Sequence, residues 1–185
     1  MFAILYESKG IQLEDDIITL NLHGYFFDMN SFFETLIGKL LANCSVMYTI
    51  KDQFNLHDMF IYTPNHNPRG RRSPTPRPDF ALMQNGKVVK LLDAKYRDLW
   101  ERSLPPYMLY QLAVYAVSGI GNKTATILYP ALSDLPTIQK IDINDPVSSG
   151  KMASVILQPI NLEKVAVLVD GEEQMLREYV DEILK

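Results

Sequence analysis

The stretch that decides the fold runs from Pro78 to Arg97 and reads PDFALMQNGKVVKLLDAKYR. It contains two short apolar runs, residues 79–84 and 87–96, on either side of an Asn85-Gly86 pair. An Asn-Gly pair between two such runs predicts a β-hairpin with a tight turn. The hairpin also carries charged residues at three positions where a buried strand normally has apolar ones: Asp79, Asp93 and Lys95.

The charged residues of this hairpin predict a binding site. Because side chains alternate along a strand, Asp93 and Lys95 point to one face and Ala94 points to the other. Buried carboxylates and a buried ammonium are costly unless they bind something, and a divalent cation and a phosphate would compensate them. The alternative is an exposed ion pair at a strand end, which contributes little. The apolar residues Leu91 and Leu92 mark this strand as buried and favour the binding site.

The register of the hairpin conflicts with a shared site. If Asn85 and Gly86 formed the whole loop of a regular hairpin, Asp79 would lie opposite Leu92. Asp79 and Asp93 would then point to opposite faces, which a shared metal forbids. We therefore predict a three-residue loop over 84–86 with a left-handed Gly86, or a β-bulge near one of the two aspartates.

Composition indicates one globular domain. The chain has 185 residues, of which 47% are hydrophobic and 22% are charged, which is ordinary for a soluble protein. The net charge of −4 gives no overall signature of nucleic-acid binding, although a local basic surface is compatible with it. The single cysteine, Cys44, excludes an internal disulfide framework. Without a membrane-spanning apolar run or a signal-peptide pattern, the sequence predicts a cytoplasmic protein.

The first helix is predicted over residues 31–43, after β-rich residues 17–27. Ser31 and Glu34 match a capping box at its start, and an apolar stripe follows at helical spacing. Glu34 has a second interpretation, a carboxylate directed into the site, although spacing alone favours the cap.

Residues 46–62 predict one or two further strands, and residues 63–78 predict a loop. The loop has five prolines, which disfavour helix and strand. It is either a solvated loop or a contact surface for DNA phosphates, because it also carries four arginines: Arg69, Arg71, Arg72 and Arg77.

The remaining segments complete an α/β pattern. A second helix is predicted from Tyr107 to Ser118, with Gln111 and Tyr115 on one face. Strands are predicted over 123–129, 137–143 and 152–157, and a helical tail begins at an Asn161 cap and continues past Gly171 to residue 184. We expect a single domain over 1–185, with a core over about 27–143 and the helical tail over about 161–185.

Several of these motifs resemble a known nuclease family. The Arg77-Pro78-Asp79 triplet, thirteen further residues and Asp93-Ala94-Lys95 resemble the PD-(D/E)XK nuclease signature. Gln111-x-x-x-Tyr115 resembles the helical motif of its RecB-like branch. The segments FFDMNSFFETLIGKLL, RPDF, LLDAKYR and YQLAVYA together resemble the nuclease domain of McrC-type restriction subunits. The resemblance implies a restriction-endonuclease-like core, a central mixed β-sheet flanked by helices.

The resemblance also implies roles for individual residues. Asp79, Asp93 and the Ala94 carbonyl would bind Mg²⁺, for which Mn²⁺ can substitute, and Glu34 would add a ligand. Lys95 would orient the attacking water or the scissile phosphate. The two helical residues, Gln111 and Tyr115, would contact phosphate or position Lys95.

McrC-type subunits work with McrB, a GTP-driven AAA+ motor, to cut DNA that carries methylated cytosine. The resemblance therefore implies double-stranded DNA as substrate and a McrB-like AAA+ GTPase as partner, and it leaves a homodimer open. Two alternatives remain at this point. One is a non-cleaving nucleic-acid-binding or assembly module of the same fold, and the other is a DNA-repair or RNA-directed nuclease of the superfamily.

Overall fold

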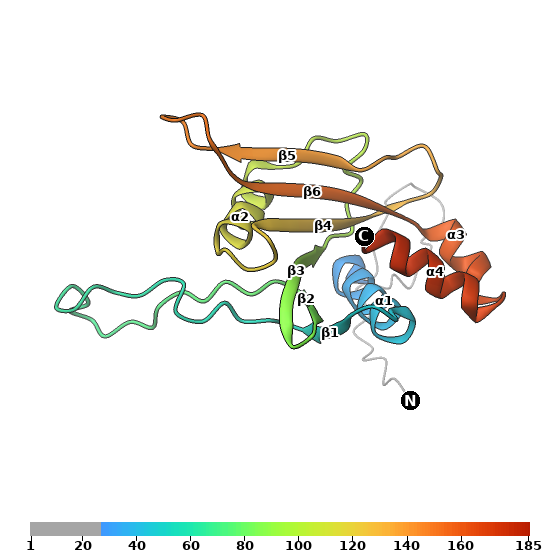
Figure 1. The fold of residues 1–185 in the computed structure, drawn as a ribbon, viewed down its shortest axis with the longest axis horizontal. Coiled ribbons are helices and arrows are strands. Elements are labelled where there is room, and N and C mark those ends of the chain that lie inside the picture. The colour runs from blue at the N-terminus through green and yellow to red at the C-terminus, as the bar shows by residue number, and fades with distance from the viewer. Residues whose placement is uncertain (1–26) are drawn as a thin grey trace, which may run out of the picture.

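The computed structural model describes residues 27–185, and the segments predicted before Phe27 lie outside them. One sheet of six strands forms its centre (Figure 1). The strands are β1 (Thr49–Asp52), β2 (Phe80–Gln84), β3 (Lys87–Ala94), β4 (Thr124–Ala131), β5 (Gln139–Asn144) and β6 (Lys151–Asn161). The helices are α1 (Met29–Cys44), α2 (Pro106–Val117), α3 (Leu162–Val169) and α4 (Glu173–Ile183).

The sheet is mixed, with the strand order β1-β2-β3-β4-β6-β5. Antiparallel pairing joins β1, β2 and β3, whereas β3, β4 and β6 are parallel and β5 closes the far edge antiparallel to β6. Helix α2 makes the crossover between the parallel strands β3 and β4. This arrangement confirms the predicted restriction-endonuclease-like core, with a central mixed sheet between helices.

Each face of the sheet packs against its own helices. Leu92 and Ala94 of β3 point into a core formed with α1, α3 and α4, and Cys44 is buried in the same core. Leu91 points to the opposite face, where it packs with Leu112 and Tyr115 of α2. Because side chains alternate, the position of Leu91 directs Asp93 to the α2 face.

The hairpin of β2 and β3 contains the one-residue shift that the sequence requires. Asn85 and Gly86 form the two-residue turn, both with positive φ (52° and 74°) as a type I′ turn demands. Met83 pairs with Val88, but Leu82 pairs with Lys90, which leaves Val89 as an extra residue. The predicted three-residue loop is therefore wrong, and the predicted bulge exists beside the turn instead of beside an aspartate.

The start of α1 corrects the predicted capping box. The helix is capped by Asp28, whose carboxylate accepts hydrogen bonds from the backbone N–H groups of Asn30 (2.9 Å) and Ser31 (3.2 Å). Ser31 lies inside the helix and donates its hydroxyl to Asp28. Glu34 is thereby free of any capping role. Ser31 matches the capping pattern, but Asp28, three residues earlier, is an equally good cap residue, and the helix begins after it.

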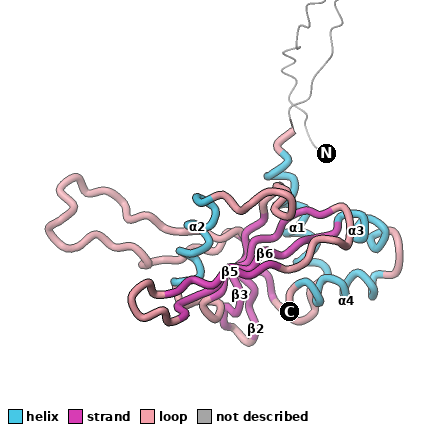
Figure 2. Tube along the Cα trace, turned by 90° about the horizontal axis from the view of Figure 1, so that it is seen from above, coloured by secondary structure: helices cyan, strands magenta, loops and turns pink. Residues whose placement is uncertain are grey.

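The connection between β1 and β2 is a long arm, residues 53–79, which projects from the body at the end away from α3 and α4 (Figures 1 and 2). Residues 59–62, predicted as strand, belong to this arm and have no strand partner within residues 27–185. Phe60, Ile61 and Tyr62 are exposed and therefore do not form the buried face of a sheet. The predicted loop over 63–78 is confirmed.

The C-terminal segment is helical, as predicted. The Asn161 side chain accepts a hydrogen bond from the Lys164 N–H (3.0 Å) and caps α3. Helix α4 then packs through Leu176 and Val180 into the core shared with α1. In the part of the chain from 27 to 185, no helix has the length and apolar character needed to cross a bilayer.

Gly121 allows the chain between α2 and β4 to pass close to β3. Its φ is +67°, and an added Cβ would lie 3.2 Å from the Lys90 Cα and 3.3 Å from the Leu91 N. These contacts are backbone atoms, which cannot move aside as a side chain can. We expect Gly121→Ala to lower the free energy of unfolding by about 2–4 kcal/mol in a urea titration.

Gly119→Ala is the matched control, because Gly119 also has a positive φ (+80°) but no atom within 4 Å of an added Cβ. It should lose only about 1–2 kcal/mol, the cost of the left-handed conformation itself. Equal losses in the two variants would contradict the close approach of this loop to β3.

Candidate metal centre

Three charged side chains meet at the carboxyl end of β3. The Lys95 ammonium lies 2.8 Å from Asp93 Oδ2 and 3.4 Å from Asp79 Oδ2. The Ala94 N–H donates to the same Asp79 oxygen at 2.9 Å. The register shift in the hairpin makes this contact possible, since it brings Asp79 beside Asp93 instead of Leu92.

Asp93 is the most constrained of these groups. Its exposed fraction is 2%, and its Oδ1 has no hydrogen-bond partner among residues 27–185. Burial raises the pKa of Asp93 to about 6, the negative charge of Asp79 acts in the same direction, and Lys95 opposes both. A buried carboxylate oxygen without a donor is an uncompensated acceptor, which a cation would satisfy.

The oxygens of this site converge on the Lys95 ammonium. Besides the two aspartates, the Ala94 carbonyl accepts from the Lys95 ammonium at 3.2 Å. Burial acts to lower the pKa of Lys95, but the negative charges and hydrogen bonds of Asp93 and Asp79 outweigh it and raise the pKa. Two carboxylates and a carbonyl are hard oxygen donors of the kind Mg²⁺ takes, so the residues present fit the ion.

Glu34 lies near this cluster without joining it. Its carboxylate accepts a hydrogen bond from the Gln53 side chain, and burial first, then the charge of Asp79, raises the pKa of Glu34. Within residues 27–185, no three His, Cys, Asp or Glu side chains are close enough together to hold a metal. Glu34 therefore does not join the two aspartates in one group of carboxylates, and the oxygens around the Lys95 ammonium are those of Asp79, Asp93 and Ala94.

The α2 residues form the wall of the site opposite α1. Gln111 donates its amide to the Tyr115 oxygen (2.7 Å), and the Tyr115 hydroxyl donates to the Arg77 carbonyl (3.1 Å). Burial raises the pKa of Tyr115 to about 12, and the charges of Asp93 and Asp79 add to it. Tyr115 therefore stays protonated and ties α2 to the chain just before Asp79.

The arginines of the arm lie apart from this cluster. Arg77 is at the arm's base, where its charge acts on Glu34. Arg69, Arg71 and Arg72 are carried away from the sheet, at the arm's outer end. The structure therefore brings together Asp79, Asp93, Lys95, Gln111 and Tyr115, places Glu34 nearby, and separates the three outer arginines from them.

Two supporting residues have no signal in the sequence. Gln53 follows β1 with a positive φ of 49° and holds Glu34. Asn30, in the first turn of α1, accepts a hydrogen bond from the Tyr96 N–H (3.2 Å) and so joins that helix to the end of β3. Both act across large sequence separations, and neither has a motif that could have identified it.

The comparisons with known proteins agree with this architecture. A family model described as "McrBC 5-methylcytosine restriction system component" matches residues 9–130. Among solved structures, the chain is similar to a chain of a half-complex from a tetradecameric assembly of Thermococcus gammatolerans McrB AAA+ hexamers with bound McrC, at 21% identity and a TM-score of 0.53. The match covers 86% of this chain and 34% of that one, so the chain spans about a third of its length.

A comparison with curated proteins found no match. The family match nevertheless extends over most of the chain and includes α1, the whole arm and the residues that form the site. The predicted resemblance is thereby confirmed. The chain belongs to the family of McrBC 5-methylcytosine restriction system components.

Proposed function

We propose that this chain is a Mg²⁺-dependent DNA endonuclease domain, the cleaving part of a McrBC-like restriction system. The observation that carries the proposal is the convergence of oxygens of Asp79, Asp93 and the Ala94 carbonyl on one point, which the Lys95 ammonium occupies at 3.4 Å or less from each of them. Such a set of oxygens at the end of a strand is suited to holding a hard divalent ion.

The proposed roles follow from the contacts of each residue. Asp79, Asp93 and Ala94 would hold Mg²⁺, which when bound supplies a more acidic water and neutralises charge on the scissile phosphate. Lys95 is long enough to leave the carboxylates and contact that phosphate or the attacking water. Glu34 would orient a water from the α1 side. Gln111 and Tyr115 would fix α2 against the segment that precedes Asp79.

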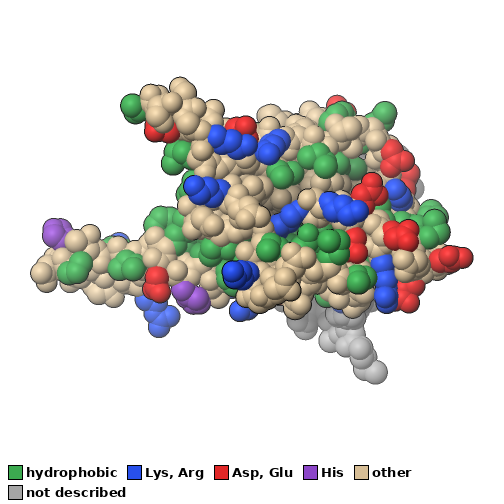
Figure 3. Space-filling model, in the orientation of Figure 1, with side chains coloured by type: hydrophobic (Ala, Val, Ile, Leu, Met, Phe, Trp, Pro, Cys, Tyr) green, Lys and Arg blue, Asp and Glu red, His purple; other side chains and the backbone are tan. Residues whose placement is uncertain are grey.

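The shape and the positive charge of the arm favour duplex DNA as the substrate. Its two legs are joined at the base by backbone hydrogen bonds, including Gln53 N–H to the Asp79 carbonyl at 2.7 Å. Near its end, the Asn67 side chain bonds both the N–H (2.9 Å) and the carbonyl (2.8 Å) of Arg71, which gives the basic segment a defined shape. Basic and histidine side chains lie along its surface in Figure 3.

Exchanging the arm's outer arginines tests its contact with DNA. Each phosphate contact contributes about 0.9 to the slope of log affinity against log salt, so losing three contacts should flatten the slope by about 2 to 3. Fluorescence anisotropy with a labelled duplex in EDTA measures this for the triple alanine variant of Arg69, Arg71 and Arg72.

The control carries alanine at three exposed lysines outside the arm, and its salt slope should match that of the unaltered chain. An equal flattening in both variants would show only a general effect of net charge. The positions exchanged in this control are Lys87, Lys140 and Lys185.

Family membership supports a motor partner. The similar solved chain comes from an assembly of McrB AAA+ hexamers with bound McrC, and by analogy a McrB-like AAA+ GTPase would act with this chain. We propose that the motor delivers DNA to the cleavage site described above.

A plasmid assay tests the function. Supercoiled plasmid is incubated with the chain in Mg²⁺, Mn²⁺ or EDTA, with and without the AAA+ partner, and with RNA as a parallel substrate. Nicking or linearisation that requires metal, and that Asp93→Asn removes, is expected. Absence of cleavage with metal and partner would favour a non-cleaving module, and cleavage of RNA alone would exclude DNA as the substrate.

A further inference from the structure

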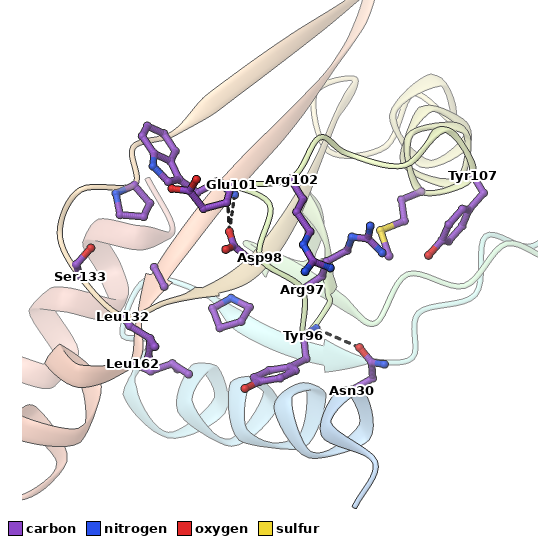
Figure 4. A pocket seen from close by; sticks show the side chains of 15 residues that line it. Asn30, Tyr96, Arg97, Asp98, Glu101, Arg102, Tyr107, Leu132, Ser133 and Leu162 are labelled. Carbon is purple, nitrogen blue, oxygen red and sulfur yellow. Dashed lines mark hydrogen bonds between the residues drawn. The ribbon is translucent and has the colours of Figure 1, made fainter.

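A cavity of about 690 Å³ opens beside the metal site, at the carboxyl ends of β3 and β4 (Figure 4). Its walls are the loop that follows Lys95, the first turns of α1, α2 and α3, and the end of β4 with the segment after it. This volume is in the range of small-molecule sites in proteins. None of the residues assigned to catalysis above lines the cavity, so it is a separate feature.

Helix α2 connects the cavity with the wall of the candidate metal centre. Tyr107 lines the cavity, and Gln111 and Tyr115 lie four and eight residues further on, on the same helix face. On the other side, Tyr96 lines the cavity and directly follows Lys95 in the chain. A strand whose phosphate lay at Lys95 would therefore have its neighbouring nucleotide at the mouth of this cavity.

Large aromatic side chains lie open around the cavity. Tyr96, Trp100 and Tyr107 have exposed fractions of 42%, 41% and 63%. The floor includes two buried apolar side chains, those of Met108 and Ala131. Rings that face a hollow with an apolar floor offer flat surfaces on which a planar group can stack.

Cationic and acceptor groups stand beside these rings. The Arg97 and Arg102 side chains lie next to one another in Figure 4, and Arg97 Nε is buried without a hydrogen-bond partner among residues 27–185. Asp98 accepts hydrogen bonds from the Trp100 and Glu101 N–H groups, both at 3.0 Å, and holds this loop in shape. The carboxylates of Asp98 and Glu101 balance the charges of the two guanidinium groups, so the cavity is not simply an anion site.

We propose that this cavity takes one unstacked nucleotide of the DNA strand, adjacent to the phosphate that is cut. Its base stacks on the aromatic side chains, and its phosphate contacts Arg97 and Arg102. The proposal rests on the proposed nuclease function. A planar heterocycle joined to a phosphate uses the rings, the apolar floor and the cations together, whereas inorganic phosphate would use only the cations.

Trp100 provides a direct readout, because it is the only tryptophan in the chain. The chain, in EDTA, is titrated with a ten-nucleotide oligothymidylate and with a ten-unit abasic strand that has the same phosphates but no bases. We expect the first to quench Trp100 fluorescence and to bind about tenfold more tightly than the second. Equal binding of the two strands, or binding of both without quenching, would overturn the proposal.

Matched variants separate the cavity from the rest of the surface. Tyr107→Ala should weaken binding of oligothymidylate about tenfold, and Tyr107→Phe should retain it, because stacking requires only the ring. Tyr110→Ala is the control, since Tyr110 is similarly exposed (67%) on the same helix but does not line the cavity. A loss in Tyr110→Ala as large as that in Tyr107→Ala would contradict the assignment.

This experiment distinguishes the two proposals, because it needs neither metal nor cleavage. Base-dependent quenching without plasmid cleavage would support the cavity and remove the nuclease function. Metal-dependent cleavage that is unaffected by Tyr107→Ala, together with equal binding of the two strands, would remove the cavity and retain the nuclease.

Discussion

The Asp93→Asn variant is expected to lose metal-dependent DNA cleavage by a factor on the order of 10²–10³. Its stability relative to that of the unaltered chain is expected to increase as the pH rises. Activity falls because the exchange removes a negatively charged oxygen donor at the centre of the site. Stability changes in the other direction because the same carboxylate is buried, with one oxygen unpartnered within residues 27–185. A residue whose replacement lowers activity but raises stability serves function at the expense of folding.

The pH dependence has a definite sign. The pKa of Asp93 is raised to about 6 in the folded chain, above the ordinary value of 3.8 that it has when unfolded. Between these values the folded chain retains a proton that the unfolded chain has lost, so rising pH disfavours folding. In EDTA, the unfolding free energy of Asp93→Asn minus that of the unaltered chain should increase by about 1–3 kcal/mol from about pH 4 to about pH 7.

Asp142→Asn is the matched control. Asp142 is an exposed aspartate whose pKa is lowered by hydrogen bonds from Lys151 and Ser154. The charged Asp142 carboxylate stabilises the folded chain above the unfolded pKa, and this stabilisation is lost as the pH falls. The unfolding free energy of Asp142→Asn minus that of the unaltered chain should therefore decrease as the pH rises, opposite to the difference for Asp93→Asn. A flat difference for Asp93→Asn, measured by urea titration at each pH, would contradict the burial of its charge.

Metal addition completes this test. Ligands that bind only the folded state raise its apparent stability, so saturating Mg²⁺ or Mn²⁺ should raise the melting temperature of the unaltered chain. Asp93→Asn should show little of this increase, and Asp142→Asn should show all of it. An equal increase in all three proteins would place the metal elsewhere.

The hairpin shows what a sequence pattern can and cannot specify. The alternation of side chains, combined with the requirement that both aspartates bind one metal, is enough to predict that the register must shift. It could not place the bulge, because several positions along the hairpin would give the same shift. Asn85-Gly86 satisfies the type I′ turn on its own, so the extra residue, Val89, lies within β3 instead of in the loop.

Glu34 and the cavity show a second limit. The spacing of Ser31 and Glu34 is a valid capping pattern, but Asp28 caps the helix and the Glu34 carboxylate is bonded by Gln53, nineteen residues further along. The cavity beside the site is assembled from the starts of α1, α2 and α3, the loop after β3, and the end of β4 with the segment that follows it. Such long-range combinations leave no periodicity or motif in any one segment, so only the folded chain reveals them.

Replacing Lys95 with methionine should raise the affinity of the site for a divalent cation while lowering cleavage about a hundredfold or more. The ammonium now contacts all three of the proposed direct donors, at 2.8 Å from Asp93, 3.2 Å from Ala94 and 3.4 Å from Asp79. It therefore occupies the point where a metal would lie, and an incoming ion must displace it. Methionine keeps the length of the side chain and removes this competing charge.

Three measurements follow for Lys95→Met. In EDTA its melting temperature should fall, because breaking a buried ion pair costs about 3–5 kcal/mol when one charge is left unpaired. Calorimetric titration with Ca²⁺ or Mn²⁺ should give a dissociation constant about tenfold lower than that of the unaltered chain, since the two carboxylates then act on the metal alone. Plasmid cleavage should be lost although the metal is bound.

Lys87→Met is the control, because Lys87 is an exposed lysine on the same strand. It should alter neither metal affinity nor cleavage. If Lys95→Met bound metal more weakly than the unaltered chain, the ammonium would be a support of the metal site and not its competitor. If it bound metal more tightly and still cleaved DNA, Lys95 would have no part in the reaction. Tighter binding with lost cleavage is the combination that requires Lys95 to move from the carboxylates to the DNA.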